Sequence, residues 1–384
     1  MARKQIYLAS KPRYEILDGL RGVASVIVVI FHIFESYSAG PAYQFINHGY
    51  LAVDFFFVLS GFVIGYAYDD RWGKMGTWGF FKRRLVRLHP MVVFGTVVGI
   101  CFYYLGQCGL FPLIGNIPAW KVILAFVMGC LMIPCGPRMD IRGWGEFNTF
   151  NGPNWSLTWE YLGNILYAFI FRRLPNIILG ILVAAAGFLT LDLCLNLNVF
   201  GLLTEARNSQ MYTPIGGWSL TSEQVYIGLT RLFYPFLAGL LLSRIGKRIR
   251  IQGGFWWCSV ILAVVLSIPC VGGEGSILNG IYNAFCIIVI FPLIVMIGAG
   301  SVINGAKGNR ICDFLGQISY PLYITHYPLM YVQMCWVYSH PDAPLFAHLT
   351  MNIGVVVLSV FIAWAALKLY DIPLRAWLKD RLWQ

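Results

Sequence analysis

Long stretches without a charged side chain divide this chain, and they limit what it can fold into. The stretches cover residues 91–120, 122–137, 174–191, 251–273, 275–306, 314–341 and 343–367. About 20 mainly apolar residues in a helix cross the hydrocarbon core of a bilayer, and each stretch reaches or approaches that length. Of the 384 residues, 58% are hydrophobic and only 12% are charged. The sequence therefore predicts an all-α fold, a polytopic transmembrane helical bundle.

Eleven apolar segments are candidate membrane spans. They are 16–37, 47–68, 88–107, 119–136, 156–171, 175–195, 225–243, 255–272, 278–299, 313–336 and 346–368. The segments 1–15, 69–87, 172–173, 244–250, 307–310 and 368–381 hold 22 of the 28 basic residues. Because basic loops stay in the cytoplasm, we expect both termini there and an even number of crossings. We therefore expect about ten spans, with one segment in the region 88–171 re-entrant or short of a full crossing.

The same pattern predicts how the chain is organised. We expect residues 1–384 to form a single transmembrane domain, with no cleaved signal peptide, no attached soluble domain and no metal. The polar loops 137–155 and 196–224 are expected to face outward. The net charge of +11 does not indicate nucleic-acid binding, because the basic residues lie in clusters that membrane topology already explains. The expected surroundings are membrane lipids.

Ten cysteines are present without a CxxC pair, and most of them lie in or beside apolar runs. Buried cysteine packs as a small hydrophobe, so packing is the main prediction for them. A bridge between cysteines at the outer face, such as Cys108 and Cys135, is the alternative.

The first apolar segment carries polar side chains at spacings that place them on one face. Arg21 and His32 are eleven residues apart, which in a helix puts them on the same side about 16 Å apart along the axis. Glu35 can approach His32 at the i,i+3 spacing. Neutral imidazole, with an unperturbed pKa of about 6.5, is a suitable general base for a hydroxyl proton, and a carboxylate would orient it. A hydrogen bond that serves packing alone is the other interpretation of His32.

Further polar groups stand in or beside later spans. Asp54 lies among aromatic residues, where a carboxylate either anchors the structure or orients a base. Arg84 and Arg87 are three residues apart and suit phosphate oxygens, although a topology signal also explains them. Glu160 follows Trp155 at the start of a short apolar helix, where it can also stabilise the helix N-terminus. His326 lies well inside a span, as a structural hydrogen-bonding group or as a substrate contact.

Together these segments resemble the integral-membrane acyltransferase-3 family, whose members O-acylate carbohydrates and related acceptors. The resemblance rests on LDGLRG with His32, VDFFFVLSGF with Asp54, RLVR from Arg84 to Arg87, WSLTWE from Trp155 to Glu160, and SYPLYITH ending at His326. These motifs occur in the expected order over nearly the whole chain.

The resemblance implies a membrane O-acyltransferase that takes an acyl group, typically acetyl, from cytoplasmic acyl-CoA. Its phosphates would lie near Arg84 and Arg87, with Arg21 on the path toward His32. The resemblance makes His32 the catalytic base and gives Glu160 a supporting role, and Asp54 is kept as a third catalytic candidate. The acceptor would be a hydroxyl of a surface glycan or lipid-linked sugar. The protein itself would lie in a bacterial inner membrane.

Glu35, Trp155 and His326 are the candidate acceptor-binding residues. An acyl-histidine intermediate is an alternative chemical route. The alternative function is a transporter or flippase that uses the buried histidines and carboxylates as a relay, although no paired halves with matching broken helices are evident.

Overall fold

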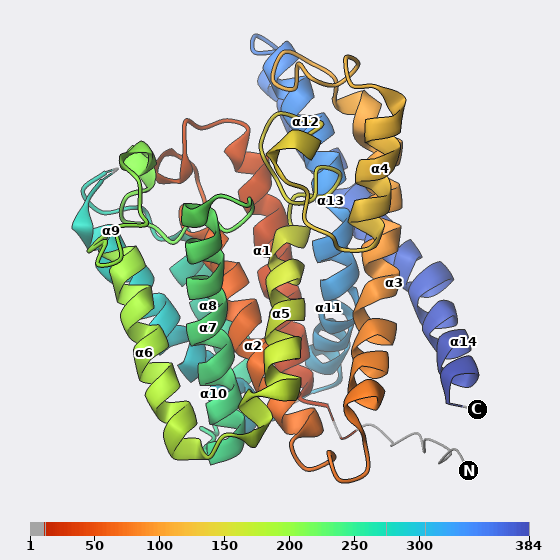
Figure 1. The fold of residues 1–384 in the computed structure, drawn as a ribbon. Helices are drawn as coiled ribbons and strands as arrows, with labels where there is room; N and C mark the ends of the chain where they lie inside the picture. Colours follow the sequence, from red (N-terminus) through yellow and green to blue (C-terminus); the bar gives the residue numbers. More distant parts are fainter. Residues whose placement is uncertain (1–10, 12, 274, 304, 384) are drawn as a thin grey trace.

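The computed structural model describes residues 11, 13–273, 275–303 and 305–383. Within these ranges every regular element is helical, as the sequence predicts (Figure 1). The main helices are α1 (Glu15–Glu35), α2 (Ala52–Tyr68), α3 (Thr77–Tyr103), α4 (Ala119–Cys130), α5 (Asn154–Phe169), α6 (Asn176–Cys194), α7 (Ser222–Ile245), α8 (Gly254–Ser267), α9 (Ile277–Phe285), α10 (Phe291–Gly300), α11 (Ala306–Thr325), α12 (Tyr327–Ser339), α13 (Leu345–Ala365) and α14 (Ile372–Leu382). Short helical segments extend or join them, among them η2 (Gly49–Leu51), η3 (Tyr104–Gly106), η5 (Phe171–Arg173), η7 (Cys286–Ile290) and η8 (Ala366–Asp371).

Every predicted span overlaps a helix in the structure, although the predicted span 313–336 is divided at His326 between α11 and α12. Among the residues that the structure describes, seven helical stretches are long and apolar enough to cross a bilayer: Glu15–Glu35, Gly49–Tyr68, Thr77–Gly106, Asn176–Cys194, Ser222–Ile245, Ile277–Gly300 and Leu345–Leu382. Within the region 88–171, α4 is the shortest helix, and its 12 residues extend only about 18 Å. A bilayer core is about 30 Å thick, so α4 fits the segment that was expected to fall short of a full crossing.

The two ends of the bundle differ in charge. Basic segments meet at one end, where Arg244 binds Asp69 and the backbone of residues 171 and 174, and Lys11 binds Asp70. We call this the basic end. The loops 131–153 and 195–221 lie at the other end, which we call the opposite end (Figure 1).

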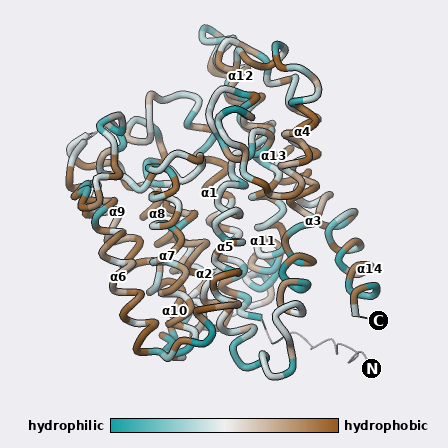
Figure 2. Tube along the Cα trace, viewed as in Figure 1, coloured by the Kyte–Doolittle hydropathy of each residue, from teal (hydrophilic) through white to brown (hydrophobic). Residues whose placement is uncertain are grey.

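Helices α1, α2 and α7 form the centre of the bundle. In the most apolar 18-residue part of each of these helices, 67%, 72% and 72% is buried. The corresponding shares are only 33% for α6 and 28% for the stretch from α13 to α14. Apolar residues continue along α6 (Figure 2), where Ile177 and Ile181 are exposed. Such exposed apolar faces are what helices present to lipid.

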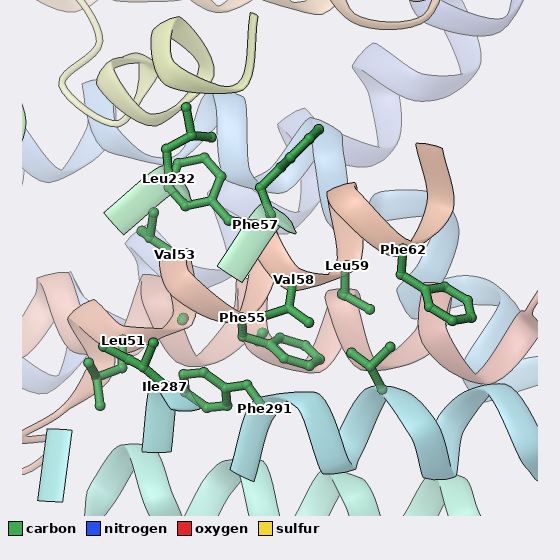
Figure 3. Packing of buried hydrophobic residues seen from close by; sticks show 14 of the residues in the cluster. Leu51, Val53, Phe55, Phe57, Val58, Leu59, Phe62, Leu232, Ile287 and Phe291 are labelled. Carbon is green, nitrogen blue, oxygen red and sulfur yellow. The ribbon is translucent and has the colours of Figure 1, made fainter. Parts of the chain in front are cut away.

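The core is densest around α2 (Figure 3). Phe55, Val58 and Leu59 are buried there, and the Phe55 ring packs against Phe291 of α10 with ring centroids 5.7 Å apart. In a bilayer these side chains would otherwise face lipid tails, so close van der Waals packing and not removal from water holds the helices together. This packing fixes α2 beside α10 and α7.

Glycines allow the central helices to approach one another closely. A Cβ on Gly61 of α2 would lie 2.0 Å from the Phe236 carbonyl oxygen of α7, and one on Gly239 would lie 2.0 Å from the Val58 carbonyl oxygen. Small residues at such crossings bring two backbones into contact. The crossing of α2 and α7 therefore requires glycine on both sides.

Replacing Gly61 with alanine is expected to lower the free energy of unfolding by about 1–3 kcal/mol, because the new methyl group must push α7 away. Thermal unfolding of the purified protein in detergent measures the loss. Gly180→Ala is the matched control, since no atom lies within 4 Å of the Cβ it would add. Equal unfolding temperatures for the two variants would contradict the requirement for glycine at this crossing.

A disulfide joins Cys108, after α3, to Cys335 of α12. The alternative pairing of Cys108 with Cys135 is therefore wrong. Cys135 is buried within the loop 131–153, where its backbone N–H donates to the Phe147 carbonyl. Cys135 is therefore buried inside its own loop, whereas α12 places Cys335 next to Cys108.

Candidate active site

His32 lies on the last turn of α1, at the opposite end of the bundle. Its Nδ1 is 2.7 Å from Glu35 Oε2, and the side chain is 17% exposed. An ionised carboxylate only accepts hydrogen bonds, so Nδ1 of the neutral ring carries the proton and Nε2 keeps its lone pair. This is the arrangement of a general base whose ring is oriented by an acid.

His326 lies between α11 and α12 and stacks on His32. The two ring centroids are 5.5 Å apart, with an angle of 29° between the planes. His326 Nδ1 donates to the carbonyl oxygens of Leu322 and Tyr323, at 3.0 and 2.9 Å. The residue is fully buried, and its Nε2 has no hydrogen-bond partner within the described part of the chain. Within the described part of the chain each ring therefore keeps an Nε2 lone pair without a partner, and the His32 ring is the more accessible of the two.

Tyr327 forms another wall of this site. Its ring meets His32 edge-on, with centroids 4.7 Å apart, and it follows His326 directly in the chain. The site thus combines α1 with the junction of α11 and α12.

Arg21 lies about three turns from His32 along α1, nearer the basic end. Its Nε donates to Ser319 Oγ at 2.9 Å, and its Nη2 is 3.0 Å from Asp18 Oδ1. The guanidinium also lies within electrostatic range of Arg87 and Glu160. One face of α1 therefore leads from a cationic group at the basic end to His32.

Arg84 and Arg87 lie on α3, which begins at Thr77 and not at residue 88 as the apolar run alone predicts. Arg84 is buried, and its Nη2 is 2.7 Å from Glu160 Oε1, which also accepts from Ser60 Oγ at 2.8 Å. The structure thus joins Glu160 to Arg84 and does not bring it to His32. Arg87 is exposed, and no described residue forms a hydrogen bond or ion pair with it.

Asp54 is engaged elsewhere. Its carboxylate accepts from Nε and Nη2 of Arg231 on α7, at 3.2 and 2.7 Å, and both side chains are almost completely buried. The guanidinium stacks over Trp155 at 5.1 Å. Asp54 and Trp155 therefore belong to a second cluster of polar side chains, built around Arg231. This favours the interpretation that Asp54 anchors the structure and does not orient a catalytic base.

The structure thus brings together three of the predicted residues: His32, Glu35 and His326. It pairs Arg84 with Glu160 and sets Arg21 on the same helix face as His32. Sequence reasoning missed Tyr327 and Arg231. Arg231 is the only charged residue of the predicted span 225–243, and that was a usable signal for a buried ion pair.

The loop beside the site holds a buried acid, Glu146, whose Oε2 accepts from Tyr331 at 2.5 Å. Burial raises the pKa of Glu146 from 4.5 to about 7, and Arg142 opposes the rise while Asp140 and Glu35 add to it. The folded state thus holds this proton more tightly than the unfolded chain, so the free energy of unfolding should fall as pH rises from about 4.5 to 7.

Glu146→Gln is expected to remove this pH dependence. Between pH 4 and pH 8, the free energy of unfolding of this variant should rise by about 3 kcal/mol relative to that of the native protein. The reason is that the glutamine amide stays neutral, whereas Glu146 must ionise while buried. Unfolding temperatures across this pH range measure the effect. Glu15→Gln, on an exposed position at the basic end, is the control. Parallel pH curves for Glu146→Gln and the native protein would contradict the assignment.

Comparisons with known proteins identify the family of the chain. A family model described as an acyltransferase domain matches residues 14–368. Protein 2 in the picA locus of Rhizobium radiobacter is 34% identical over 163 residues, which are 41% of this chain and 81% of that protein. O-acetyltransferase OatA of Staphylococcus aureus is 22% identical over 97% of this chain, and the match spans only 59% of OatA.

A third relative, acyltransferase MdmB of Streptomyces mycarofaciens, is 23% identical over 81% of this chain and 77% of its own length. No solved structure gives a significant match.

Proposed function

Since the chain belongs to the acyltransferase-3 family, we propose that it is a membrane O-acetyltransferase that transfers acetyl from acetyl-CoA to a hydroxyl of a glycan or lipid-linked sugar. The donor binds at the basic end and the acceptor at the opposite end. The observation that carries the proposal is the pair of stacked histidines, His32 and His326, in which no described residue uses either Nε2 lone pair.

The basic end suits the phosphates of coenzyme A. Arg87 is exposed and lies within electrostatic range of Asp371 and Arg375, and Arg21 lies within range of Arg87. Guanidinium groups bind phosphate oxygens in bidentate fashion. From Arg21 to His32 the helix rises about 16 Å, and the extended arm of coenzyme A has to bridge this length.

At the opposite end, the acceptor hydroxyl donates to an Nε2 lone pair. His32 takes the hydroxyl proton as the oxygen attacks the acetyl carbon. The carbon–sulfur bond then breaks, and the coenzyme A thiolate takes up the proton. Glu35 stabilises the imidazolium that forms in between, and His326 positions the hydroxyl.

Two observations support an orientation with the basic end and both termini in the cytoplasm of a bacterial inner membrane. Basic loops remain on the cytoplasmic side of a membrane. The bridge between Cys108 and Cys335 lies near the opposite end, and disulfides persist in oxidising compartments outside the cytoplasm.

Arg87→Ala is expected to raise the KM for acetyl-CoA about tenfold with little change in the KM for the acceptor, since one charge-assisted phosphate contact is worth about 1.5–3 kcal/mol. Initial rates at varied donor and acceptor concentrations measure both constants. Arg310→Ala removes an exposed charge in the α11 segment at the same end and is the matched control. A KM for acetyl-CoA that is unchanged would remove Arg87 from the donor site.

The proposed activity is tested by two measurements. Purified protein in detergent should release coenzyme A from acetyl-CoA when an acceptor sugar is present. Mass spectrometry of surface glycans, with and without the protein, should identify the acetylated hydroxyl. A transporter or flippase would release no coenzyme A, and that result would defeat the proposal.

A further inference from the structure

A second cluster with the chemistry of acyl transfer lies outside the histidine pair. It consists of Cys270 in the loop after α8, His48 before η2, and Asn283 on α9. Cys270 Sγ is 3.7 Å from His48 Nε2, and His48 Nδ1 is 3.1 Å from Asn283 Oδ1. Three separate segments therefore place an imidazole between a thiol and an amide, with a contact to each.

The contacts of Asn283 determine which nitrogen of His48 carries the proton. Asn283 Nδ2 donates to the Tyr212 carbonyl oxygen at 3.0 Å, and a carbonyl oxygen can only accept. Oδ1 therefore faces His48, and it also accepts from the Tyr50 hydroxyl at 3.1 Å, which itself lies 3.0 Å from His48 Nδ1. Because the Tyr50 proton is directed to Oδ1, the bond between His48 and Oδ1 is made by a proton on His48 Nδ1. His48 Nε2 then has the lone pair that faces the Cys270 thiol.

The environment keeps this imidazole neutral and the thiol reachable. His48 is 1% exposed, and burial lowers its pKa to about 4, against the opposing effect of the Asn283 hydrogen bond. Cys270 is partly exposed. The same burial makes the imidazole a weak base, so Cys270 keeps its proton at rest and passes it to His48 only as sulfur attacks.

The cluster lies at the same end of the bundle as His32. The loop before α9 is at the end away from both termini (Figure 1). Gly49 packs directly on Phe31, the neighbour of His32, and the Phe31 and Tyr50 rings have centroids 6.3 Å apart. An ester released at His32 would therefore leave at the end where Cys270 is exposed.

We propose that Cys270, His48 and Asn283 form a second acyl-transfer site, which takes acyl groups from esters at the opposite end. The thiol gives its proton to His48, and sulfur attacks the ester carbon. The carbon–oxygen bond breaks, and the alcohol leaves with that proton. A hydroxyl acceptor then attacks the Cys270 thioester, His48 takes the hydroxyl proton, and the thiolate leaves and is reprotonated. The amide of Asn283 orients the ring throughout.

The test uses the full chain in detergent with p-nitrophenyl acetate as the ester and no acetyl-CoA. We expect a burst of nitrophenol and an acetyl group on the Cys270 peptide that neutral hydroxylamine removes. Cys270→Ala should lose this acetylation, and His48→Gln should slow it at least about tenfold. Cys101→Ala, which removes an exposed thiol on α3, should leave it unchanged.

Alkylation by iodoacetamide gives a second readout that needs no ester. Cys270 should react at least about tenfold faster in the native protein than in His48→Gln. Equal alkylation rates, or acetyl found on other residues but not on Cys270, would overturn the inference. Acetyl transfer from acetyl-CoA depends on His32 and is measured in a separate assay. Either proposal, the second site or the O-acetyltransferase activity, can therefore be contradicted without affecting the other.

Discussion

Replacing His32 with alanine should reduce acetyl transfer from acetyl-CoA by about 100- to 10,000-fold, the usual contribution of a general base. The reason is geometric. Glu35 fixes the proton on Nδ1, so Nε2 of His32 is the lone pair that takes the hydroxyl proton. Alanine removes this group and leaves the small, partly exposed space of one ring. Coenzyme A release and acceptor acetylation, measured on the purified variant, give the size of the loss.

His340→Ala is the control for this variant, because His340 is exposed at the end of α12 and its ring packs on Trp336, away from His32. It should keep the native rate. The unfolding temperature of His32→Ala should stay within a few degrees of the native value, which separates a lost base from a lost fold. A folded His32→Ala protein that transfers acetyl at the native rate would exclude His32 as the base.

Replacing Arg231 with methionine should lower the free energy of unfolding by about 3–5 kcal/mol, the cost of leaving a buried charge without its partner. The exposed fractions of the two side chains are 2% for Arg231 and 0% for Asp54. Arg231 Nη2 also donates to the Tyr50 carbonyl at 2.7 Å, so the substitution frees a backbone acceptor as well. Thermal unfolding in detergent measures the loss.

In the double variant Asp54→Asn, Arg231→Met, the loss in free energy of unfolding should be smaller than the sum of the losses in the two single variants. The reason is that no unpaired buried charge remains. Asp70→Asn is the control. It breaks an exposed pair with Lys11 in which Asp70 is 62% exposed, and such pairs contribute at most about 1 kcal/mol. Additive losses in the double variant would show that Asp54 and Arg231 act separately.

The apolar runs and the basic loops sufficed to predict the helices, because the bilayer imposes length and charge rules on every segment. All eleven predicted spans are helical, and α4 is the short one. The start of α3 was missed, since Arg84 and Arg87 look like loop residues until Glu160 is seen to neutralise Arg84.

The pairings between distant segments could not be predicted from a single sequence. Asp54 and Arg231 are 177 residues apart, and the Cys108 partner is 227 residues away. Nothing in local periodicity records which helices are neighbours. His32 and Glu35 were found because both lie on one helix, where spacing alone determines proximity.

The link between Cys108 and Cys335 has a consequence for how the protein is made. No covalent bond can form before both partners have been synthesised, so the connection waits until most of the chain has been translated and α12 has been inserted. Because α12 begins directly after His326, this cross-link is among the last steps in assembling that wall of the site. Cells without thiol-oxidising enzymes should therefore produce the protein with this segment held only by its non-covalent contacts, such as the hydrogen bond from Tyr331 to Glu146.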